Sequence, residues 1–552
     1  PEPPVGPEPG AGPVEPEPGI GPAGPVVGAD LGRPVPLSQS GAWLGLRDFY
    51  TAEGVSAWDG KVPYHITSNP VIADCYANVI VRFVGDVVAT GRFDPAEPFY
   101  IVELGAGSGT FSFHLLRRLT ELTRALGVGG VRITYVMTDV VEANINFWRQ
   151  HPQLHPFVAT GLLAFGRFDV MSDHAVHLIA PEDGGEVEEL AAFANPPIVI
   201  ANYMFDSVPQ DWFRVTDGRL EIMAVTVTAA SENGSGPPRS TRLLGTRQPT
   251  EQPSYGDAEV DALLADRLRR SEGMTVVFPI AALRCLRRLV DAGAGRLCLL
   301  ASDLSTHEAP IGDVDLELVG GLFYLPVDLT VIGEYLGRLG RCWHRACQSE
   351  AFDTSLSIVG FGPDELRETE HAFSTLIDTF GPRGHRLVAG LAARVGRALQ
   401  PEQWLALAAL LRYDPRMLDE SVTLVTAYAS SGVLTAHQRR ELMMALDRLA
   451  DNTYWLPGQA DTVFNIGVIL HEFAEVEAAI AMFIRSLEAA GDSAETLFSL
   501  GLCQQSLGRH AAAVDSFRRA LALDPRHVLA RGWIAQIQAD LSARGRPGVE
   551  GL

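Results

Sequence analysis

Apolar runs alternate with amphipathic stretches from about residue 43 to residue 384. The runs are rich in Val, Ile and Leu and cover 98–104, 133–139, 196–202, 274–280 and 296–303. Stretches with a helical spacing of apolar residues, such as 111–126, lie between them. A run that is apolar throughout is typical of a strand buried on both faces, and such strands alternating with helices form mostly parallel sheets. The pattern predicts an α/β fold.

The strand pattern stops after about residue 386, and helical periodicity continues. Residues 460–493 and 494–527 form two units of the 34-residue period of tetratricopeptide repeats. The second unit carries the repeat's packing residues, which are Leu497, Leu500, Gly501, Ala513, Phe517, Ala520 and Pro525. The first unit matches at Ile466, Gly467, Ala479 and Phe483 but has Ser486 and Gly491 at the later positions. We expect further helices over 400–450 and a capping helix at 533–541.

A chain of 552 residues is too long for one hydrophobic core. Residues 1–38 are dominated by Pro and Gly, which cannot build a core, so they are predicted to be a disordered tail or linker. We expect an α/β domain over 39–385 and an all-α domain with tetratricopeptide repeats over 386–548. Helical repeats present docking surfaces, which predicts a protein or peptide partner.

The charge balance disfavours one class of partner. Lys and Arg total 44 against 67 Asp and Glu, a formal net charge of −23. An acidic surface repels phosphate backbones, so the sequence predicts no nucleic-acid binding and favours a basic protein segment as partner. Lys61 is the only lysine, while Arg, Ala and Gly are abundant, a usage that we interpret as that of a GC-rich bacterial genome.

The cysteines and the hydropathy of the chain indicate in which cellular compartment the protein is expected. Six cysteines are scattered along the chain, as expected for a reducing cytoplasm. Cys342 and Cys347 flank His344, but no second ligand pair lies at a short spacing, so no metal site is predicted. No apolar run is long enough for a membrane span and no signal peptide is visible, although a chain starting at Pro1 could be processed or truncated.

The sequence YIVELGAGSGTFSFHLL (100–116) carries the clearest chemistry. A strand ends at Glu103, a turn containing Gly105, Ala106, Gly107 and Gly109 follows, and a helix begins near residue 110. Glycines allow a sharp turn and a close approach to a ligand, and the helix amino end offers free amides. Two other interpretations of this turn are open. Dinucleotide-binding domains use a similar turn, and a tight strand–helix turn can also occur without any ligand. A carboxylate just before the glycines would repel a pyrophosphate but suits a cationic amino group.

Acidic residues also follow the next strands. Asp139 ends the run 133–139, where a carboxylate can accept hydrogen bonds from ribose hydroxyls. It lies further along than the roughly 20 residues of the dinucleotide fingerprint. Asp169 is the second candidate for the ribose contact.

The stretch IVIANYMFDSVP (198–209) places Asn202, Tyr203 and Asp206 where a buried strand ends. Ligands of open α/β sheets bind outside the carboxyl ends of the strands, so these side chains are candidates for the reaction site. The other reading is structural, because Asn and Asp also cap helices and support turns.

VELGAGSG resembles the first motif of class I S-adenosylmethionine (SAM)-dependent methyltransferases, which have a Rossmann-like fold. ANYMFDSVP resembles the ANEFFDALP stretch of the MidA family of methyltransferases, which includes a mitochondrial arginine methyltransferase of complex I assembly. Segments 64–80, 297–305 and 325–336 are also similar to that family, so the likeness covers about residues 45–385.

The resemblance implies SAM as cofactor and a role for each motif residue. Glu103 and the glycine turn would line the donor, Asp139 would hold its ribose, and Asn202 and Asp206 would face methyl transfer, with Asp206 as the candidate base. Tyr203 replaces an acidic residue of the family, and Leu304 replaces a Tyr. Arginine acceptors are oriented by carboxylates, so the acceptor could have changed.

Three functions remain open from the sequence. The first is a SAM-dependent methyltransferase that acts on a protein or peptide, with arginine as one option, docked by the repeats. The second is a repeat-based scaffold whose methyltransferase domain binds the donor without turnover. The third is a methyltransferase that acts on a small molecule.

Overall fold

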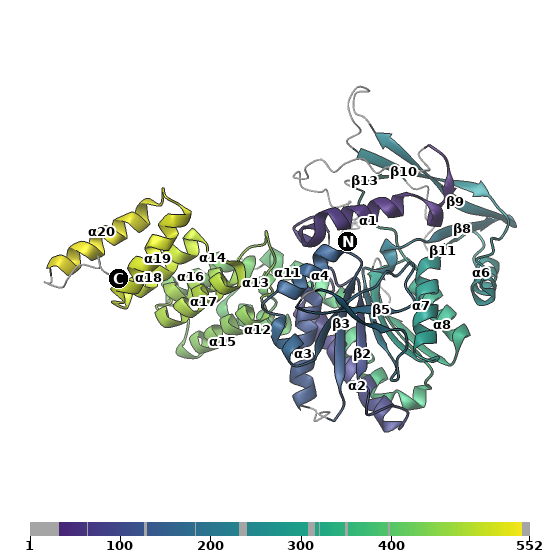
Figure 1. Cartoon of the computed structure of the whole chain (residues 1–552), viewed down its shortest axis with the longest axis horizontal. Helices are drawn as coiled ribbons and strands as arrows, with labels where there is room; N and C mark the ends of the chain where they lie inside the picture. Colours follow the sequence, from purple (N-terminus) through teal and green to yellow (C-terminus); the bar gives the residue numbers. More distant parts are fainter. Residues whose placement is uncertain are drawn as a thin grey trace, which may run out of the picture.

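The computed structural model describes residues 32–62, 64–125, 130–182, 184–230, 240–306, 315–318, 321–347, 352–395 and 398–543. An α/β body carries an antiparallel sheet on one side and a helical arm on another (Figure 1). Residues 1–31 of the predicted tail (1–38) lie outside the described residues. Its end is ordered, contrary to the prediction, because β1 (Val35–Pro36) pairs with a strand of the antiparallel sheet and Leu37 is fully buried.

The central sheet has nine strands among the described residues. Their order across the sheet is β14 (Cys342–Cys347), β15 (Phe352–Val359), β12 (Leu297–Leu304), β7 (Ile198–Asn202), β2 (Phe99–Leu104), β3 (Ile133–Asp139), β4 (Leu163–Arg167), β5 (Val176–Ile179) and β6 (Glu186–Leu190). The five central strands, from β12 to β4, are parallel. The strands at both edges pair antiparallel. The sheet is therefore mixed, and the predicted parallel arrangement holds only at its centre.

Helices cover both faces of this sheet. One face packs against α2 (Pro70–Ala89), α3 (Thr110–Ala125) and α4 (Glu142–Gln150), whose apolar side chains share a core with β2 and β3. The other face packs against α7 (Ile280–Ala292) and α8 (Leu329–Leu339). Because helices cover both faces of the sheet, the side chains on both sides of these strands are buried, which explains why the runs are apolar throughout.

A second sheet was not predicted. Its order is β11 (Thr275–Phe278), β8 (Asp211–Thr216), β9 (Arg219–Ala230), β10 (Ser240–Pro249) and β13 (Asp315–Leu318), and all its pairings are antiparallel. The run 274–280 was predicted as a strand of the main sheet, which is wrong: β11 pairs with β8 instead. An apolar run shows that a strand is buried but does not show which sheet buries it.

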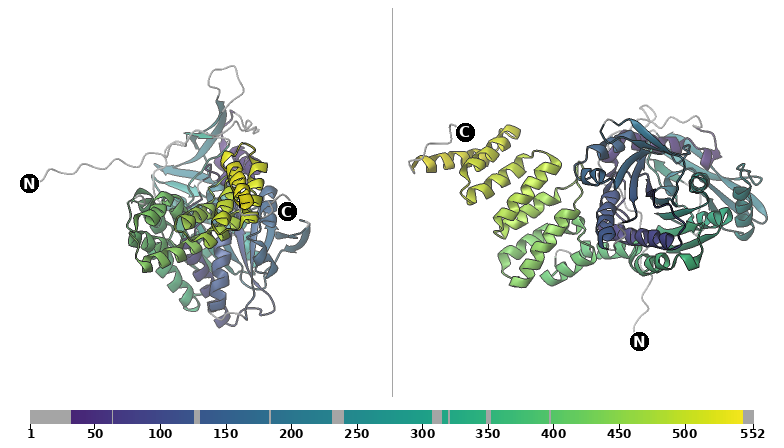
Figure 2. Two further views of the ribbon diagram at one scale, coloured as in Figure 1. Left: turned by 90° about the vertical axis from the view of Figure 1, so that its left-hand side faces the viewer. Right: turned by 60° about the horizontal axis from the view of Figure 1, so that its bottom comes forward.

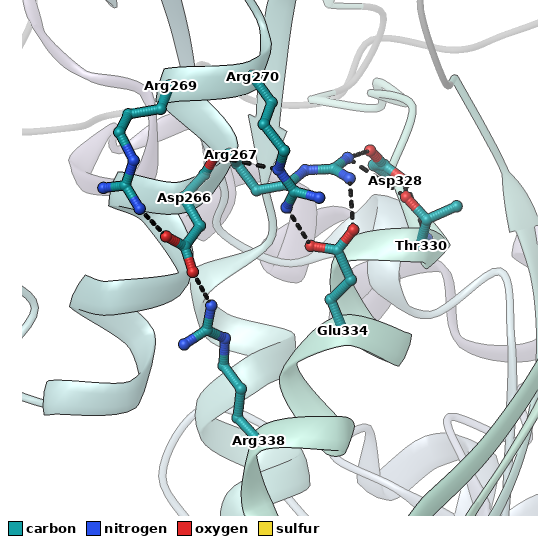
Figure 3. A network of polar contacts seen from close by, with 8 residues as sticks. All are labelled: Asp266, Arg267, Arg269, Arg270, Asp328, Thr330, Glu334 and Arg338. Atoms are coloured by element: carbon teal, nitrogen blue, oxygen red, sulfur yellow. Dashed lines mark hydrogen bonds and ion pairs between the residues drawn. The ribbon is translucent and has the colours of Figure 1, made fainter.

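Ion pairs tie α6 (Ala258–Arg270) to α8 (Figure 3). Glu334 Oε1 lies 3.1 Å from Arg267 Nη1, and Glu334 Oε2 lies 2.9 Å from Arg270 Nη2. Arg338 pairs with Asp266 in the same network. These contacts join α6, which lies against β8 and β11 of the second sheet, to α8, which packs on the central sheet.

The arm consists of α11 (Pro382–Val395), α12 (Pro401–Leu410), α13 (Pro415–Asp419), α14 (Val422–Ser431), α15 (Ala436–Asn452), α16 (Thr462–Glu472), α17 (Val476–Ala490), α18 (Ala494–Ser506), α19 (His510–Leu523) and α20 (Val528–Ala543). The pairs α16–α17 and α18–α19 are the two predicted repeats. Their glycines allow the close approach that the repeat requires, because a Cβ on Gly467 or Gly501 would come within 2.6 Å or 2.5 Å of the Phe483 or Phe517 ring.

The arm projects from one side of the α/β body but contacts it where the two meet (Figure 2). Tyr454 and Leu456, between α15 and α16, are buried in the same core as α2 and α3. The Gln459 side chain donates a 2.7 Å hydrogen bond to the Tyr64 hydroxyl. The arm is therefore packed onto the body and is not merely linked to it.

Candidate active site

A cavity of about 650 Å³ lies at the carboxyl ends of the parallel strands. Its walls come from the turns after β2, β3, β4 and β7. Side chains of α1 (Ala42–Glu53) and the short helix η2 (Gly54–Trp58) also line it. In Figure 1, α1 lies between the central sheet and the antiparallel sheet. The volume falls in the range of small-molecule and cofactor sites.

Glu103 ends β2 and lines the cavity, as predicted for a donor-facing residue. Only 4% of it is exposed. Its Oε2 accepts hydrogen bonds from Ser112 and, at 2.6 Å, from the Tyr135 hydroxyl. Burial raises the pKa of Glu103 to about 7, although both hydrogen bonds favour the ionised form. A cationic ligand would stabilise its charge.

The glycine-rich turn folds tightly over β3. Ala106 N donates a 2.8 Å hydrogen bond to the Thr138 carbonyl, and Trp148 Nε1 donates one of 2.9 Å to the Gly107 carbonyl. Gly107 has a φ of +56°, which favours glycine, and a Cβ there would stand 2.4 Å from the Trp58 ring. The sequence predicted the donor itself in this space, whereas the structure places the indole of Trp58 there.

Gly105 and Gly109 also have positive φ angles, of 64° and 82°. A Cβ on Gly105 would lie 3.0 Å from Met204 Sδ, and a Cβ on Gly109 would lie 2.9 Å from the Tyr454 hydroxyl. Each glycine of the turn therefore faces a different neighbour, and one of these neighbours belongs to the arm.

Asp139 ends β3 and lines the cavity, but its carboxylate already has partners. Oδ1 accepts from the amides of Val140 and Val141 at 2.7 and 2.9 Å. Oδ2 accepts from the Gly107 amide at 3.2 Å and from Asn144 Nδ2 at 3.0 Å. Asp139 thus fixes the glycine turn, and a ribose would share its oxygens with these groups.

Asp169 follows β4 and lies at the same cavity. Its Oδ2 forms a 2.7 Å ion pair with Arg47 of α1, and its Oδ1 accepts from the Met171 amide at 2.8 Å. This contact joins α1 to the sheet side of the cavity.

Asn202 and Tyr203 reach the cavity from the end of β7. Asn202 Oδ1 accepts a 3.0 Å hydrogen bond from the Tyr76 hydroxyl, which also contacts Ser302 Oγ at 2.6 Å. Asn202 Nδ2 is buried and has no hydrogen-bond partner among the residues that the structure describes. It is therefore a donor whose hydrogen-bonding capacity is unused among the described residues. Tyr203 has a φ of +52°, unusual for a residue other than glycine, so the turn here is strained.

Asp206 lies behind this wall. It is 1% exposed, does not line the cavity, and accepts a 2.7 Å hydrogen bond from Ser207 Oγ. Its carboxyl lies close to that of Asp303, and burial raises the pKa of both, with mutual repulsion adding to that of Asp303. One of the two therefore holds a proton more readily than an exposed Asp would.

Sequence reasoning missed three residues of this site. Trp58 covers Gly107, Tyr76 orients Asn202, and Asp303 faces Asp206. Tyr76 and Asp303 lie in segments whose resemblance was recognised, but no local pattern gives their distance to β7. Trp58 lies in a short helix with no motif.

No group of three or more His, Cys, Asp or Glu suited to a metal occurs in the described parts of the chain. His344 Nδ1, near Cys342 and Cys347, contacts Ser357 Oγ at 2.8 Å instead. Among the helices that the structure describes, none combines the length and apolarity needed to cross a bilayer.

Comparison with known proteins gives two family matches. Residues 86–301 match the family described as "Putative S-adenosyl-L-methionine-dependent methyltransferase". This stretch contains the glycine turn and the β7 turn. The protein is a SAM-dependent methyltransferase, and SAM is its cofactor. Residues 458–526 match a tetratricopeptide repeat family, which confirms the two predicted repeats. The match is not specific to the MidA family.

A search of curated proteins finds no match. Among solved structures, a protein from Burkholderia thailandensis described as a "likely methyl transferase" and bound to S-adenosyl-homocysteine is 14% identical, with a TM-score of 0.35 over 64% of this chain and 85% of that one. Magnesium protoporphyrin IX methyltransferase from Synechocystis PCC 6803, with S-adenosyl-homocysteine bound, is 12% identical, with a TM-score of 0.25 over 58% and 99%. Neither likeness is close enough to transfer a substrate.

Proposed function

We propose that this methyltransferase is of the class I, MidA-like type and methylates a protein or peptide acceptor docked by its repeats. The observation that supports it most is that one cavity holds both the glycine turn after β2 and the Asn202–Tyr203 wall after β7. A donor on the glycine turn would have its methyl group near that wall. We also propose the division into a catalytic part (39–385) and a helical part (386–548). The cytoplasmic and bacterial setting stays a prediction from composition.

The chemistry is an in-line displacement. The acceptor's lone pair forms the new bond to the methyl carbon, the bond from that carbon to sulfur breaks, and its electron pair neutralises the sulfonium. A nitrogen acceptor then loses one proton. We assign Asn202 Nδ2 to orienting the acceptor, because it is a buried donor without a partner. We assign proton acceptance to the Asp206–Asp303 pair, which lies behind the cavity wall and therefore takes the proton by relay and not by direct contact with the acceptor; burial raises the pKa of both carboxyls.

For the donor, we assign the amino group to Glu103, the turn to Gly105, Ala106, Gly107 and Gly109, and the ribose to Asp139. Asp169 is the alternative ribose contact. Burial raises the pKa of Glu103, which means that its ionised form is unfavourable in this buried position. A cationic amino group beside it would stabilise the carboxylate, which supports this assignment.

One set of contacts favours the inactive scaffold as the second candidate. Glu103 and Asp139 both hold groups of the chain itself, and Trp58 covers Gly107. Incubating the protein with radiolabelled SAM and a proteome-derived peptide library distinguishes the two. Label on peptides supports the active enzyme, and SAM binding without any label supports the scaffold. Label on small molecules alone would replace the peptide acceptor with a metabolite.

A further inference from the structure

A separate cavity, of about 420 Å³, lies where the arm meets the α/β body. Its walls come from α2 and α3 of the body, from α15 of the arm, and from the turn between α12 and α13. None of its lining residues lines the cavity that holds the glycine turn. Its charged side chains are four arginines and three carboxylates, namely Arg117, Arg118, Arg412, Arg448, Asp74, Glu121 and Asp451.

Two of the carboxylates are occupied by two of the arginines. Asp74, whose side chain is 8% exposed, lies 2.5 Å from Arg118 Nε and 2.9 Å from Arg412 Nη2. Glu121 lies 2.8 Å from Arg118 Nη1. A single buried carboxylate therefore neutralises arginines from both the body and the arm.

The other two arginines are poorly compensated. Asp451 Oδ1 lies 2.9 Å from Arg485 Nη1, outside the cavity, and its Oδ2 lies 3.7 Å from Arg117 Nη2. Burial lowers the pKa of Arg117, although the carboxylates near it act in the opposite direction. Arg448 donates a 2.7 Å hydrogen bond to the Tyr413 hydroxyl and forms no ion pair with any residue that the structure describes. With Arg485 included, five arginines share three carboxylates, so two positive charges in this group have no counter-charge.

A buried polar group in the wall also lacks a partner. His114 is 6% exposed, and its Nδ1 has no hydrogen-bond partner within the described structure. Burial lowers the pKa of His114 to about 3, so the imidazole is neutral and one of its two tautomers carries a donor at Nδ1. Buried polar groups are normally paired, so this nitrogen indicates a ligand beside it.

The turn that brings Arg412 to the cavity is strained. Arg412 and Tyr413 have φ angles of +53° and +58°, which residues other than glycine rarely adopt. Asn452 Nδ2 holds this conformation by donating hydrogen bonds of 2.8 and 3.0 Å to the two carbonyl oxygens. Such strain persists where the surrounding contacts impose it, and it is concentrated at ligand sites.

We propose that this cavity binds the phosphate group of a small phosphorylated molecule. A phosphate monoester carries a charge of about −1.5 to −2 at pH 7, which matches the two uncompensated positive charges. Guanidinium groups bind phosphate oxygens through paired N–H donors. We assign the main contacts to Arg117 and Arg448, the two arginines that the carboxylates compensate least.

The site has a consequence for the arrangement of the two parts of the chain. Arg117 belongs to α3 of the body and Arg448 belongs to α15 of the arm, so one bound phosphate would join them. The cavity volume is in the range of small-molecule sites and exceeds the needs of a single ion. This inference does not rest on the proposed function, because the cavity is separate from the donor site.

The test is calorimetry of the full-length protein at constant ionic strength with glycerol 3-phosphate, inorganic phosphate and glycerol. We expect one saturable site for the probes that carry phosphate and no binding of glycerol. The double variant Arg117→Gln/Arg448→Gln should weaken phosphate binding by about tenfold or more. The matched control Arg440→Gln/Arg518→Gln changes two exposed arginines of the arm outside the cavity and should bind like the wild type.

The two phosphate probes distinguish the sources of the group. Tighter binding of glycerol 3-phosphate supports a phosphorylated molecule as the ligand, and equal binding supports the phosphate site with the free ion as its ligand. If neither probe binds the wild type, or if the double variant binds as well as the wild type, the proposal is wrong.

Arg448→Gln alone is the second variant if the double one does not fold, because Arg448 has no carboxylate partner to lose. It should weaken binding of glycerol 3-phosphate severalfold. A ligand that binds only the folded protein raises the melting temperature, so this probe should stabilise the wild type more than Arg448→Gln. Equal stabilisation of the two proteins would also overturn the proposal.

Discussion

The hydroxyl of Tyr454 lies against Gly109, so that a Cβ on Gly109 would stand 2.9 Å from it. Tyr454 belongs to the arm, and Gly109 closes the turn that we assign to the donor. The Tyr454 ring also stacks on His151, with centroids 4.3 Å apart, and His151 Nε2 lies 3.0 Å from the Trp455 carbonyl oxygen. The arm thus completes the wall behind the glycine turn.

This contact predicts that the arm supports donor binding. Tyr454→Ala would remove a buried ring and cost about 3–5 kcal/mol of stability, and the loosened turn should bind SAM less tightly. Tyr454→Phe keeps the ring and removes a hydroxyl without a partner, so its stability and SAM affinity should match the wild type. Thermal melts and calorimetry on both variants check this. A Tyr454→Ala protein that is stable and binds SAM normally would show that the arm is only attached.

Glu103 predicts a pH dependence of donor binding. Its pKa is raised to about 7, chiefly by burial, while Ser112, Tyr135 and Asp139 face it. A raised carboxyl pKa contributes stability that is complete below the unfolded pKa and is lost as pH rises through about 7. Binding of a cationic amino group has the opposite sign, because it needs the ionised form.

SAM affinity should therefore rise by up to about tenfold between pH 6 and pH 8. In Glu103→Gln the affinity should be lower and flat over this range. Calorimetry at both pH values measures it. If the SAM affinity of the wild type does not change with pH, Glu103 does not bind the amino group of SAM.

Asp139 should contribute to the donor site in two ways. Asp139→Ala loses the acceptor of the Gly107 amide as well as the proposed ribose contact, and we expect SAM to bind about 1–3 kcal/mol more weakly. Adenosine binding by the same variant separates these effects, because adenosine has the ribose without the amino acid. If SAM binding is unchanged, Asp169 is the next position to replace.

Asp206 should act in the transfer step. Asp206→Asn keeps the shape but changes the proton held with Asp303, so turnover should fall by about 10²-fold or more while SAM affinity holds. The structural reading predicts a loss of about 1 kcal/mol in stability with unchanged turnover per folded molecule. Single-turnover rates and melting temperatures of the same preparation decide between them.

The sequence predicted the features that depend on local patterns. The strand–glycine–helix turn at Glu103–Gly109 and the two repeats each have a fixed spacing set by backbone geometry or helix packing. The β7 turn was also located correctly, at the end of a buried strand.

Long-range contacts could not be predicted in this way. Asp303 and Trp58 are brought to the site by sheet pairing and by a short helix without a motif. The second sheet escaped notice because β11 has the same apolar composition as a strand of the main sheet. The sequence also did not show that Asp206 lies behind the cavity wall, because a spacing along the chain does not show which side of a turn faces the cavity.

The most direct test of the donor site is a calorimetric titration of SAM into the wild type and Gly107→Val. A valine at Gly107 needs an unfavourable φ and drives its Cβ into Trp58, which should disrupt the turn. Gly91→Val is the control, because Gly91 has a φ of +69° but open space around its Cβ position. We predict one SAM site in the wild type and in Gly91→Val, and no detectable binding in Gly107→Val. Equal SAM affinity in all three proteins would contradict the assignment of the donor to this turn.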